Sequence, residues 1–252
     1  MLGFTKWQLG KSNSLSRLRR MPRPSTAPRR RSYDQYCASA RALDAVGDRW
    51  TLLIVRELLA GPRRYTDLHA DLPGVSTDML ATRLKDMERD GLATRRRLPP
   101  PVSAYAYELT ERGAALLPVL RALAAWGASA LDGPRPVDAV RAHWFAIPLL
   151  TALEATTGRT GPAGYVEVRL DEGVFHLRTG GGGQAAGCGD GPAPAAPDAA
   201  LAMDTATCTA VARGELTPAA AIAAGRLTVA GDGPHAAALR AAAAEAGDLV
   251  TS

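Results

Sequence analysis

The sequence predicts an α+β fold organised as two consecutive domains, and three observations support this prediction. The chain has 252 residues, more than the roughly 100 to 200 of a usual single domain. Apolar residues make up 46% of it and charged residues 22%, which is the balance of a folded globular protein. Helical periodicity and a β-hairpin occur on each side of a Gly- and Pro-rich linker. We therefore expect a leader at 1–32, a first domain at 33–132, the linker at 133–136 and a second domain at 137–252.

The positive charge of the chain is concentrated in the leader. The net charge is +5 and the pI is 9.4, yet residues 1–33 alone hold nine Lys or Arg and no Asp or Glu. Residues 34–132 hold thirteen charges of each sign, and residues 133–252 hold eight basic against twelve acidic side chains. Whether the folded body binds nucleic acid therefore depends on where its arginines lie, not on the overall pI.

The leader is rich in Pro and Arg and lacks apolar periodicity, so we expect residues 1–32 to be disordered. Three interpretations are open: a basic arm that contacts phosphates, an organelle transit peptide, or translation from an upstream start codon with Met21 as the true first residue. The Ala, Gly, Pro and Arg bias of the chain resembles that of a GC-rich bacterial genome and weighs against the transit peptide.

The first domain opens with two helices. Apolar residues three or four positions apart predict a short helix from about Tyr33 to Val46, which Gly47-Asp48 interrupts. A second helix begins at Arg49 or Trp50 and ends before the Gly-Pro pair that follows. Its apolar positions are dense, so we expect it to be buried.

The following segment has the order of a helix-turn-helix. Residues 65–72 predict a two-turn helix, Pro73-Gly74 a turn, and Ser76 the N-cap of a longer helix that ends near Asp90. In a helix-turn-helix, the second helix enters the major groove of DNA with its N-terminal residues. These residues alone do not distinguish this motif from a plain αα-hairpin in a helical bundle.

A β-hairpin directly behind these helices favours the DNA-binding interpretation. Residues 92–97 predict a strand, 99–101 a rigid tip and 105–109 a returning strand, which together form a wing. The arginines of its first strand lie where a wing meets DNA phosphates. The residues expected to contact DNA are Arg63, Arg64, Tyr65, Ser76, Thr77, Asp78, Ala81, Thr82, Arg83, Lys85, Arg95, Arg96 and Arg97.

The last helix of the first domain predicts a dimer. It runs from Thr110 to Leu131, with a kink or a loosened turn at Pro118. Its Leu- and Ala-rich surface is larger than a small winged domain covers, so we expect it to pack against a second copy, which matches a palindromic DNA site. The residues expected at the dimer seam are Tyr36, Leu43, Leu116, Leu120 and Leu123.

Residues 37–131 resemble the HxlR-type winged helix-turn-helix regulators. The resemblance rests on several separated motifs, among them Gly47-Asp48-Arg49-Trp50-Thr51, Arg56-Glu57-Leu58, Gly61-Pro62-Arg63-Arg64-Tyr65, Leu72-Pro73-Gly74-Val75-Ser76 and Tyr107-Glu108-Leu109-Thr110. It implies a dimeric, DNA-binding transcription factor whose N-terminal and last helices form the dimer seam. This chain has Asp78 where the family commonly has Asn, so no operator preference carries over.

Cys37 is a candidate that this resemblance raises, because some members of the family sense electrophiles or oxidants through a cysteine near the first helix. Arg41, one helical turn on, favours the thiolate, whereas Asp34 opposes it. The alternative is an inert cysteine at a helix interface. The chain has three cysteines without CxxC spacing, so we expect neither a disulfide framework nor a zinc cluster.

The second domain alternates helices and strands. The pattern predicts helices at 137–157, at 204–213, after Thr217-Pro218 and from Pro234, strands at 165–170, 174–178, 199–203 and 226–230, and a low-complexity loop at 180–197. This order, together with Met203-Asp204, Arg213-Gly214-Glu215-Leu216 and Leu227-Thr228-Val229, resembles the sterol-carrier-protein-like α+β domain.

This second resemblance implies an apolar cavity that takes a lipid or another small hydrophobic ligand. The residues expected to line it are Trp144, Ile147, Phe175, Met203, Val211 and Ile222. The alternative is a core filled by its own side chains, in which case the domain serves as a scaffold or as a second dimer surface.

The expected function is that of a cytoplasmic transcriptional regulator whose partners are double-stranded DNA, a second copy and a small hydrophobic ligand. We expect no membrane partner, because we find no apolar run of the roughly 18 to 20 residues that a span requires. The four histidines lie on four predicted elements without catalytic or metal spacing, so we expect no enzyme activity, no metal and no cofactor. The alternatives are a non-enzymatic lipid-binding or protein-interaction module with a vestigial winged helix, and a redox-sensing regulator that acts through Cys37.

Overall fold

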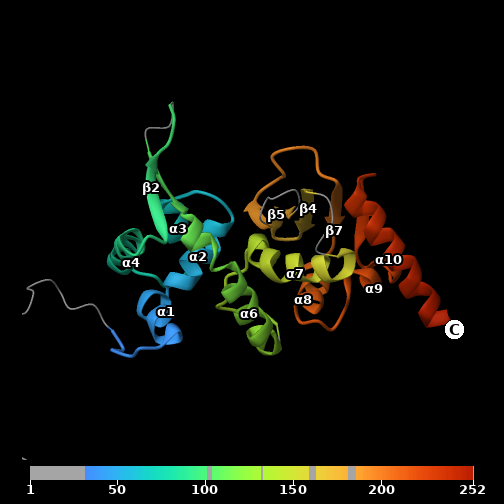
Figure 1. Ribbon diagram of the computed structural model, residues 1–252. Coiled ribbons are helices and arrows are strands. Elements are labelled where there is room, and N and C mark those ends of the chain that lie inside the picture. Colours follow the sequence, from blue (N-terminus) through green and yellow to red (C-terminus); the bar gives the residue numbers. More distant parts are fainter. Residues whose placement is uncertain (1–31, 101–103, 132, 159–162, 181–185, 252) are drawn as a thin grey trace, which may run out of the picture.

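The computed structural model describes residues 32–100, 104–131, 133–158, 163–180 and 186–251. It consists of two lobes, a first lobe coloured blue to green and a second lobe coloured yellow to red (Figure 1). The expected basic leader and the wing-tip residues 101–103 lie outside the described residues.

The first lobe is mainly helical and contains one small sheet. Its elements are α1 (Ala38–Val46), α2 (Thr51–Leu59), β1 (Arg63–Arg64), α3 (Tyr65–Asp71), α4 (Thr77–Arg89), β2 (Ala93–Arg97), β3 (Tyr105–Leu109), α5 (Glu111–Ala114), α6 (Leu117–Gly127) and the 3-10 helix η1 (Ala128–Ala130). The strands are antiparallel in the order β1-β3-β2. The predicted helix-turn-helix and wing are confirmed, and β1 is an added strand.

The helix-turn-helix packs on α2. Ile54 of α2, Leu68 of α3 and Leu80 of α4 are each 0% exposed and belong to one hydrophobic cluster. The turn between α3 and α4 contains Gly74 with φ +84°, a left-handed conformation that glycine adopts without steric cost. Because α3 and α4 both bury apolar side chains in the cluster that they share with α2, the outward face of α4 has a fixed direction.

The second lobe is built on a five-stranded sheet. Its elements are η2 (Ala142–Phe145), α7 (Ala146–Thr157), β4 (Gly164–Leu170), β5 (Gly173–Thr179), β6 (Gly187–Asp190), β7 (Ala199–Ala202), α8 (Thr205–Ala212), α9 (Pro218–Ala223), β8 (Thr228–Ala230) and α10 (Pro234–Thr251). The strand order is β6-β5-β4-β7-β8, with β4 and β7 parallel and the other neighbours antiparallel. Leu149 and Leu150 of α7 are buried against the sheet together with Phe175 of β5.

The helix expected at 137–157 is shorter than predicted. Residues 137–141 are not helical, and α7 begins only at Ala146 after the 3-10 helix η2. Pro148 supplies the reason: it lacks an N–H, and its ring would clash with the carbonyl four residues earlier, so a helix accepts it only in the first turn. Before this helix, Arg135 and Asp138 form a turn held by a 2.8 Å ion pair.

The loop expected at 180–197 contains a strand. Gly187–Asp190 forms β6, which pairs with β5 from Phe175↔Asp190 to Arg178↔Gly187. Its two glycines are poor strand formers, so the sequence carried no strand signal here. Backbone hydrogen bonds to the exposed edge of β5 form the strand despite this composition.

The last helix of the first lobe is interrupted, as Pro118 predicted. Helix α5 ends at Ala114, and α6 starts at Leu117 with the proline in its first turn. Taken together, Glu111–Ala130 is long and apolar enough to cross a membrane by length and composition alone, which corrects the expectation that no stretch reaches that length. We interpret it as part of the folded protein, because Leu120 packs into the core of the first lobe and Arg121 pairs with Glu154 of α7 at 2.7 Å.

Candidate nucleic-acid interface

Helix α4 presents a polar face to solvent. Its buried residues are Leu80, Leu84 and Met87. On the opposite face Thr77, Asp78, Thr82 and Lys85 are exposed, and Ala81 is half-buried. Small and polar side chains at the N-terminal end allow the backbone of the helix to approach base edges closely. The structure thus brings these five residues of α4 onto one surface.

The N-terminal end of α4 is fixed by hydrogen bonds. The Ser76 hydroxyl accepts from the Met79 N–H at 3.3 Å, which confirms the predicted N-cap. The Tyr65 hydroxyl donates to the carbonyl of Thr77 at 2.8 Å, and the Thr82 hydroxyl donates to the carbonyl of Asp78 at 2.7 Å. Tyr65 belongs to α3, so its phenol fixes the spacing between the two helices of the motif.

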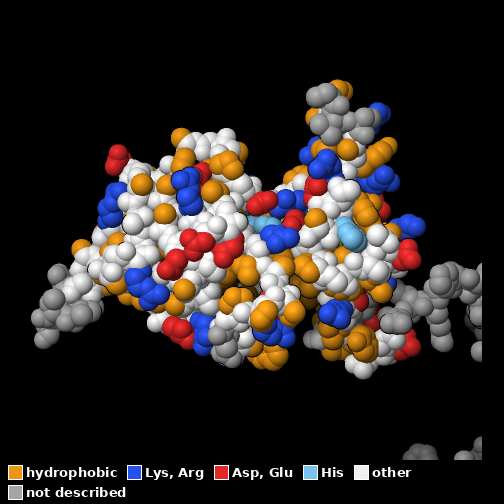
Figure 2. All heavy atoms as spheres, turned by 180° about the vertical axis from the view of Figure 1, so that it is seen from behind, with side chains coloured by type: hydrophobic (Ala, Val, Ile, Leu, Met, Phe, Trp, Pro, Cys, Tyr) orange, Lys and Arg blue, Asp and Glu red, His pale blue; other side chains and the backbone are white. Residues whose placement is uncertain are grey.

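The wing carries its arginines along an exposed strand. The Arg95 guanidinium lies 4.0 Å from the centre of the Tyr105 ring, and Arg96 pairs with Glu108 of the neighbouring strand at 2.5 Å. Arg97 is exposed at the end of β2. Figure 2 shows Lys and Arg side chains along the protruding hairpin. Stacking orients Arg95 in advance, whereas the charge of Arg96 is partly neutralised by Glu108.

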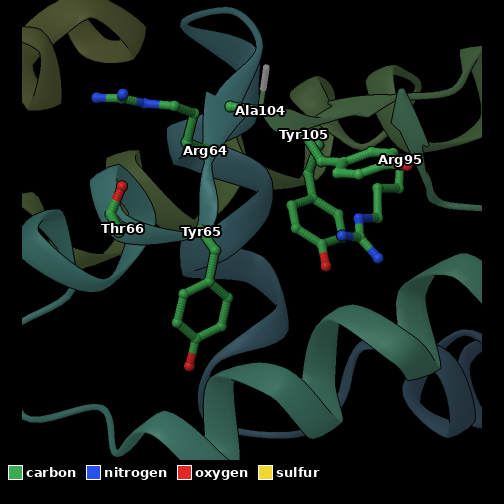
Figure 3. A pocket seen from close by; sticks show the side chains of 7 residues that line it. Arg64, Tyr65, Thr66, Arg95, Ala104 and Tyr105 are labelled. Atoms are coloured by element: carbon green, nitrogen blue, oxygen red, sulfur yellow. The ribbon is translucent and has the colours of Figure 1, made fainter. Parts of the chain in front are cut away.

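A hollow of about 460 Å³ lies between the start of α3 and the wing (Figure 3). Its lining consists of Arg64, Tyr65, Thr66, Arg95, Ala104, Tyr105 and Tyr107. Arg64 is held by Asp67 at 2.9 Å, and this hydrogen-bonded pairing lowers the pKa of Asp67 and raises that of Arg64. Guanidinium and phenol groups are donors that can bind DNA phosphates. The hollow therefore extends the polar surface of α4 toward the place where the phosphate backbone of a bound DNA would lie.

Two of the arginines expected at DNA face the protein instead. Arg63 is 3.1 Å from Asp190 of the second lobe, and its side chain is only 15% exposed. Arg83 pairs with Asp86 at 2.9 Å and with Asp48 at 3.5 Å. Both charges are neutralised within the chain, and these placements do not support the expected DNA contacts of Arg63 and Arg83.

The residues expected at a dimer seam divide into two groups. Tyr36, Leu43 and Leu123 are 106%, 49% and 43% exposed. Leu116 and Leu120 instead pack into the core of their own lobe, so we remove them from the expected seam. Trp126 of α6, which is 84% exposed, was missed, although the same helical spacing that selected Leu123 also reaches it. The exposed surface of α1 and α6 thus carries large apolar side chains.

The three cysteines differ in environment. Cys37 is exposed at the N-cap of α1, where hydrogen bonds from the backbone of Ala40 and Ser39 lower the pKa of its thiol. Burial, reinforced by the charge of Glu57, raises the pKa of Cys188 to about 12. Burial likewise raises the pKa of Cys208 to about 12. Among these thiols, the one at the helix N-terminus is the candidate for reaction.

The residues expected to line a ligand pocket are not gathered around one space. Phe175, Met203 and Val211 are buried in the core of the second lobe, with Ile222 packed against them. Ile147 belongs to the hydrophobic cluster of the first lobe, and Trp144 donates a hydrogen bond to Glu57 of α2 at 2.9 Å. The latter two side chains therefore face the boundary between the lobes, which corrects their assignment to the pocket.

One charged cluster in the described part of the chain has ligand atoms close enough to hold a metal ion. Oxygen and nitrogen atoms of Glu57, Asp71 and His143 lie within 4.8 Å of one another. Each carboxylate already binds a guanidinium, Arg56 at 2.7 Å and Arg141 at 3.2 Å. A divalent cation there would lie beside two arginines, so the chemistry of the cluster favours ion pairs within the protein.

Comparison with known proteins identifies relatives of both lobes. The model of the HxlR-like helix-turn-helix family matches residues 45–134, and that of the SCP-2 sterol transfer family matches residues 161–243. The HTH-type transcriptional regulator YvaP of Bacillus subtilis is 36% identical over 92 residues, which cover 36% of this chain and 85% of that protein.

A second relative from the same organism is also known as a structure. The HTH-type transcriptional regulator YodB of Bacillus subtilis is 38% identical over 85 residues, covering 34% of this chain and 76% of that protein. The reduced form of YodB covers 40% of this chain and 100% of its own, at 32% identity and a TM-score of 0.35.

Proposed function

The chain belongs to the HxlR-like helix-turn-helix family of transcriptional regulators, and on that premise we propose that it binds a palindromic operator as a dimer in the cytoplasm. We further propose that its second lobe, an SCP-2 sterol transfer domain, senses a small apolar ligand. The observation that carries the DNA-binding part is the exposed, capped N-terminal end of α4 beside an arginine-bearing wing.

In the proposed complex, α4 enters the major groove and the wing lies on the flanking backbone. Thr77 and Thr82 are short enough to donate or accept at base edges. Asp78 accepts from the amino group of cytosine and repels phosphates, so it discriminates between sequences and adds no general affinity. Arg95 and Arg97 supply phosphate contacts, whose strength falls as salt rises, whereas the charge of Arg64 is partly neutralised by Asp67.

The proposed dimer rests on the apolar surface of α1 and α6. Large apolar groups such as Trp126 are costly to leave in water, and a second copy covers them symmetrically. Two α4 helices related by a two-fold axis then reach half-sites about one DNA turn apart.

The wing is tested by the salt dependence of DNA binding. We expect replacement of Arg95, Arg96 and Arg97 together by Ala to weaken binding to all sequences and to reduce the log–log salt slope by about one unit per lost phosphate contact. Arg96→Ala alone should change the slope least, because Glu108 already neutralises part of that charge. The measurement is fluorescence anisotropy at several salt concentrations, on an operator selected from genomic fragments.

Arg135→Ala is a matched control, because Arg135 is also exposed and paired with an acidic residue but lies in the linker. It should leave the slope unchanged. A triple wing variant with the wild-type slope would remove the wing from the mechanism.

A second candidate function is redox sensing through Cys37. The observation that favours it is the exposed thiol at the N-cap of α1, where two backbone N–H groups stabilise the thiolate. Because α1 also belongs to the proposed dimer seam, modification of Cys37 would alter the spacing of the two α4 helices.

A further inference from the structure

A buried carboxylate connects the two lobes. Glu57 of α2 is 0% exposed, and Arg56 of the same helix donates to its Oε1 at 2.7 Å and 2.9 Å. From the second lobe, Trp144 Nε1 donates to Oε1 at 2.9 Å, and His143 Nε2 lies 2.6 Å from Oε2. Two of the three residues that bind this carboxylate thus come from the other lobe.

Glu57 is ionised in this environment. Burial alone would raise its pKa, but the hydrogen bond with His143 and the charge of Arg56 outweigh burial and hold the pKa below its ordinary value. An ionised carboxylate is retained in a protein interior only where it is paired and hydrogen-bonded. The second lobe therefore supplies contacts that helix α2 needs.

Asp190 makes a second connection, from the edge strand β6. Its Oδ2 accepts from Arg63 at 3.1 Å, and its Oδ1 lies 3.5 Å from His143. Its backbone N–H donates to the carbonyl of Ala60, just past the end of α2, at 3.3 Å. An edge strand that would otherwise present unpaired backbone groups is thus partly covered by the first lobe.

A third connection reaches the helix-turn-helix. Arg141 pairs with Asp71, the last residue of α3, at 3.2 Å and donates to the carbonyl of Ala70 at 3.4 Å. Figure 2 shows charged and histidine side chains gathered where the two lobes meet. Each charged side chain at this boundary thus faces an opposite charge or a hydrogen-bonding group from the other lobe. Each lobe therefore depends on the other to balance its boundary charges.

We propose that Glu57, Arg63 and Asp71 of the first lobe with Arg141, His143 and Asp190 of the second form an interdomain joint that holds the wing and α3 in the DNA-reading arrangement. Arg63 is the link to the wing: it lies in β1, which pairs with β3 (Arg63↔Tyr107), and β1 leads directly into α3. The second lobe then serves to position the wing and α3 for DNA binding. The effect on DNA rests on the proposed function, whereas the joint itself does not.

The joint is tested by the cooperativity of unfolding of the full chain. We expect the wild type to show a single calorimetric transition, because neither lobe satisfies its boundary charges alone. Glu57→Gln, which keeps the shape but removes the charge, should split it into two transitions about 5 °C or more apart. His143→Gln, made from the other side, should do the same and provides the test if Glu57→Gln fails to fold.

Asp138→Asn is the matched control, since Asp138 also pairs with an arginine but outside the joint, and it should keep one transition. Two independent transitions in the wild type, or one unchanged transition in both joint variants, would overturn the proposal.

Operator binding by Asp190→Asn tests the positioning step. Release of Arg63 should weaken operator binding about 3- to 10-fold and should not steepen the salt slope, because the wing loses its placement and Arg63 gains no phosphate contact. Tighter binding with a slope steeper by about one unit would mean that the joint withholds Arg63 from DNA, which overturns the positioning role. A wild-type chain that binds no operator refutes the proposed function, while calorimetry still decides the joint.

Discussion

The cysteine side chains differ in reactivity because of where each thiol lies. Burial raises the pKa of Cys188 and Cys208 to about 12, so both thiols stay protonated at neutral pH. The backbone N–H groups that stabilise the Cys37 thiolate act in the opposite direction. The redox candidate thus differs from the other two in the direction of its pKa shift as well as in access.

We therefore expect Cys37 to be alkylated at least about 100-fold faster than the other two thiols in the native chain. Because its pKa is lowered, the midpoint of its rate against pH should lie below the ordinary value of about 8.5. Mass spectrometry after timed treatment with iodoacetamide measures both, and Cys37→Ser is the control that should leave the native chain unmodified. Rapid native alkylation of Cys188 would mean that the boundary between the lobes is open.

Residue chemistry at the proposed DNA-binding surface was partly readable from sequence. Ser76 and the polar residues after it were located because a cap precedes an apolar helical period, which is local information. Arg63 was misplaced because the partner that turns it away, Asp190, is distant in sequence. Glu57 carries a usable signal in the sequence, because a charge inside a dense apolar helix requires a buried partner.

At the scale of elements, periodicity predicted most helices and strands, and the errors have physical causes. Apolar spacing predicts a helix over 137–157 that is too long, because Pro148 is accepted only in the first turn of a helix and α7 therefore begins at Ala146. Strands β1 and β6 were missed because one has two residues and the other is rich in glycine, so their pairing with longer strands forms them. The intrinsic strand propensity of a segment is therefore a weak predictor wherever pairing with a neighbouring strand determines its conformation.

Helix α6 provides the test of the dimer. We expect Leu123→Glu with Trp126→Glu to raise the dimer dissociation constant by at least about 100-fold, because each charge would be buried without a partner in the seam. Both side chains are exposed in the single chain, so the substitution should not unfold it, unlike one at the buried Leu120. Sedimentation velocity at micromolar concentration measures the change.

Val137→Glu is the control for this experiment, since Val137 is an equally exposed apolar residue that lies in neither α1 nor α6. It should leave the dimer intact. The seam would be wrongly placed if the wild type sedimented as a monomer at these concentrations, or if the α6 variant remained a dimer.

At the scale of the whole molecule, the second lobe holds its proposed ligand site behind a packed core. Phe175, Leu177 and Leu201 are 0% to 1% exposed at its centre. A ligand that enters must displace such side chains or move the helices over the sheet, since interiors have few voids larger than a water molecule. The joint attaches to η2 and β6 of the same lobe, so we expect such a movement to be transmitted to α2 and β1.

We therefore expect an apolar ligand to change operator affinity, and to do so through the joint. A ligand shifts the equilibrium only by its differential affinity for two conformations, and typical couplings of about 1 to 3 kcal/mol correspond to roughly 5- to 150-fold. Native mass spectrometry of the full chain purified from its own host identifies a copurified compound, and operator titration with and without it measures the coupling. The His143→Gln variant should still bind the compound but lose most of the effect of the compound on operator affinity. The reason is that the ligand is bound in the core of the second lobe, whereas its effect passes through the joint. If the wild type carries no compound, binds no hydrophobic dye and keeps its operator affinity on addition of lipid extracts, the second lobe senses no ligand. It then serves only as a scaffold for the DNA-binding elements of the first lobe.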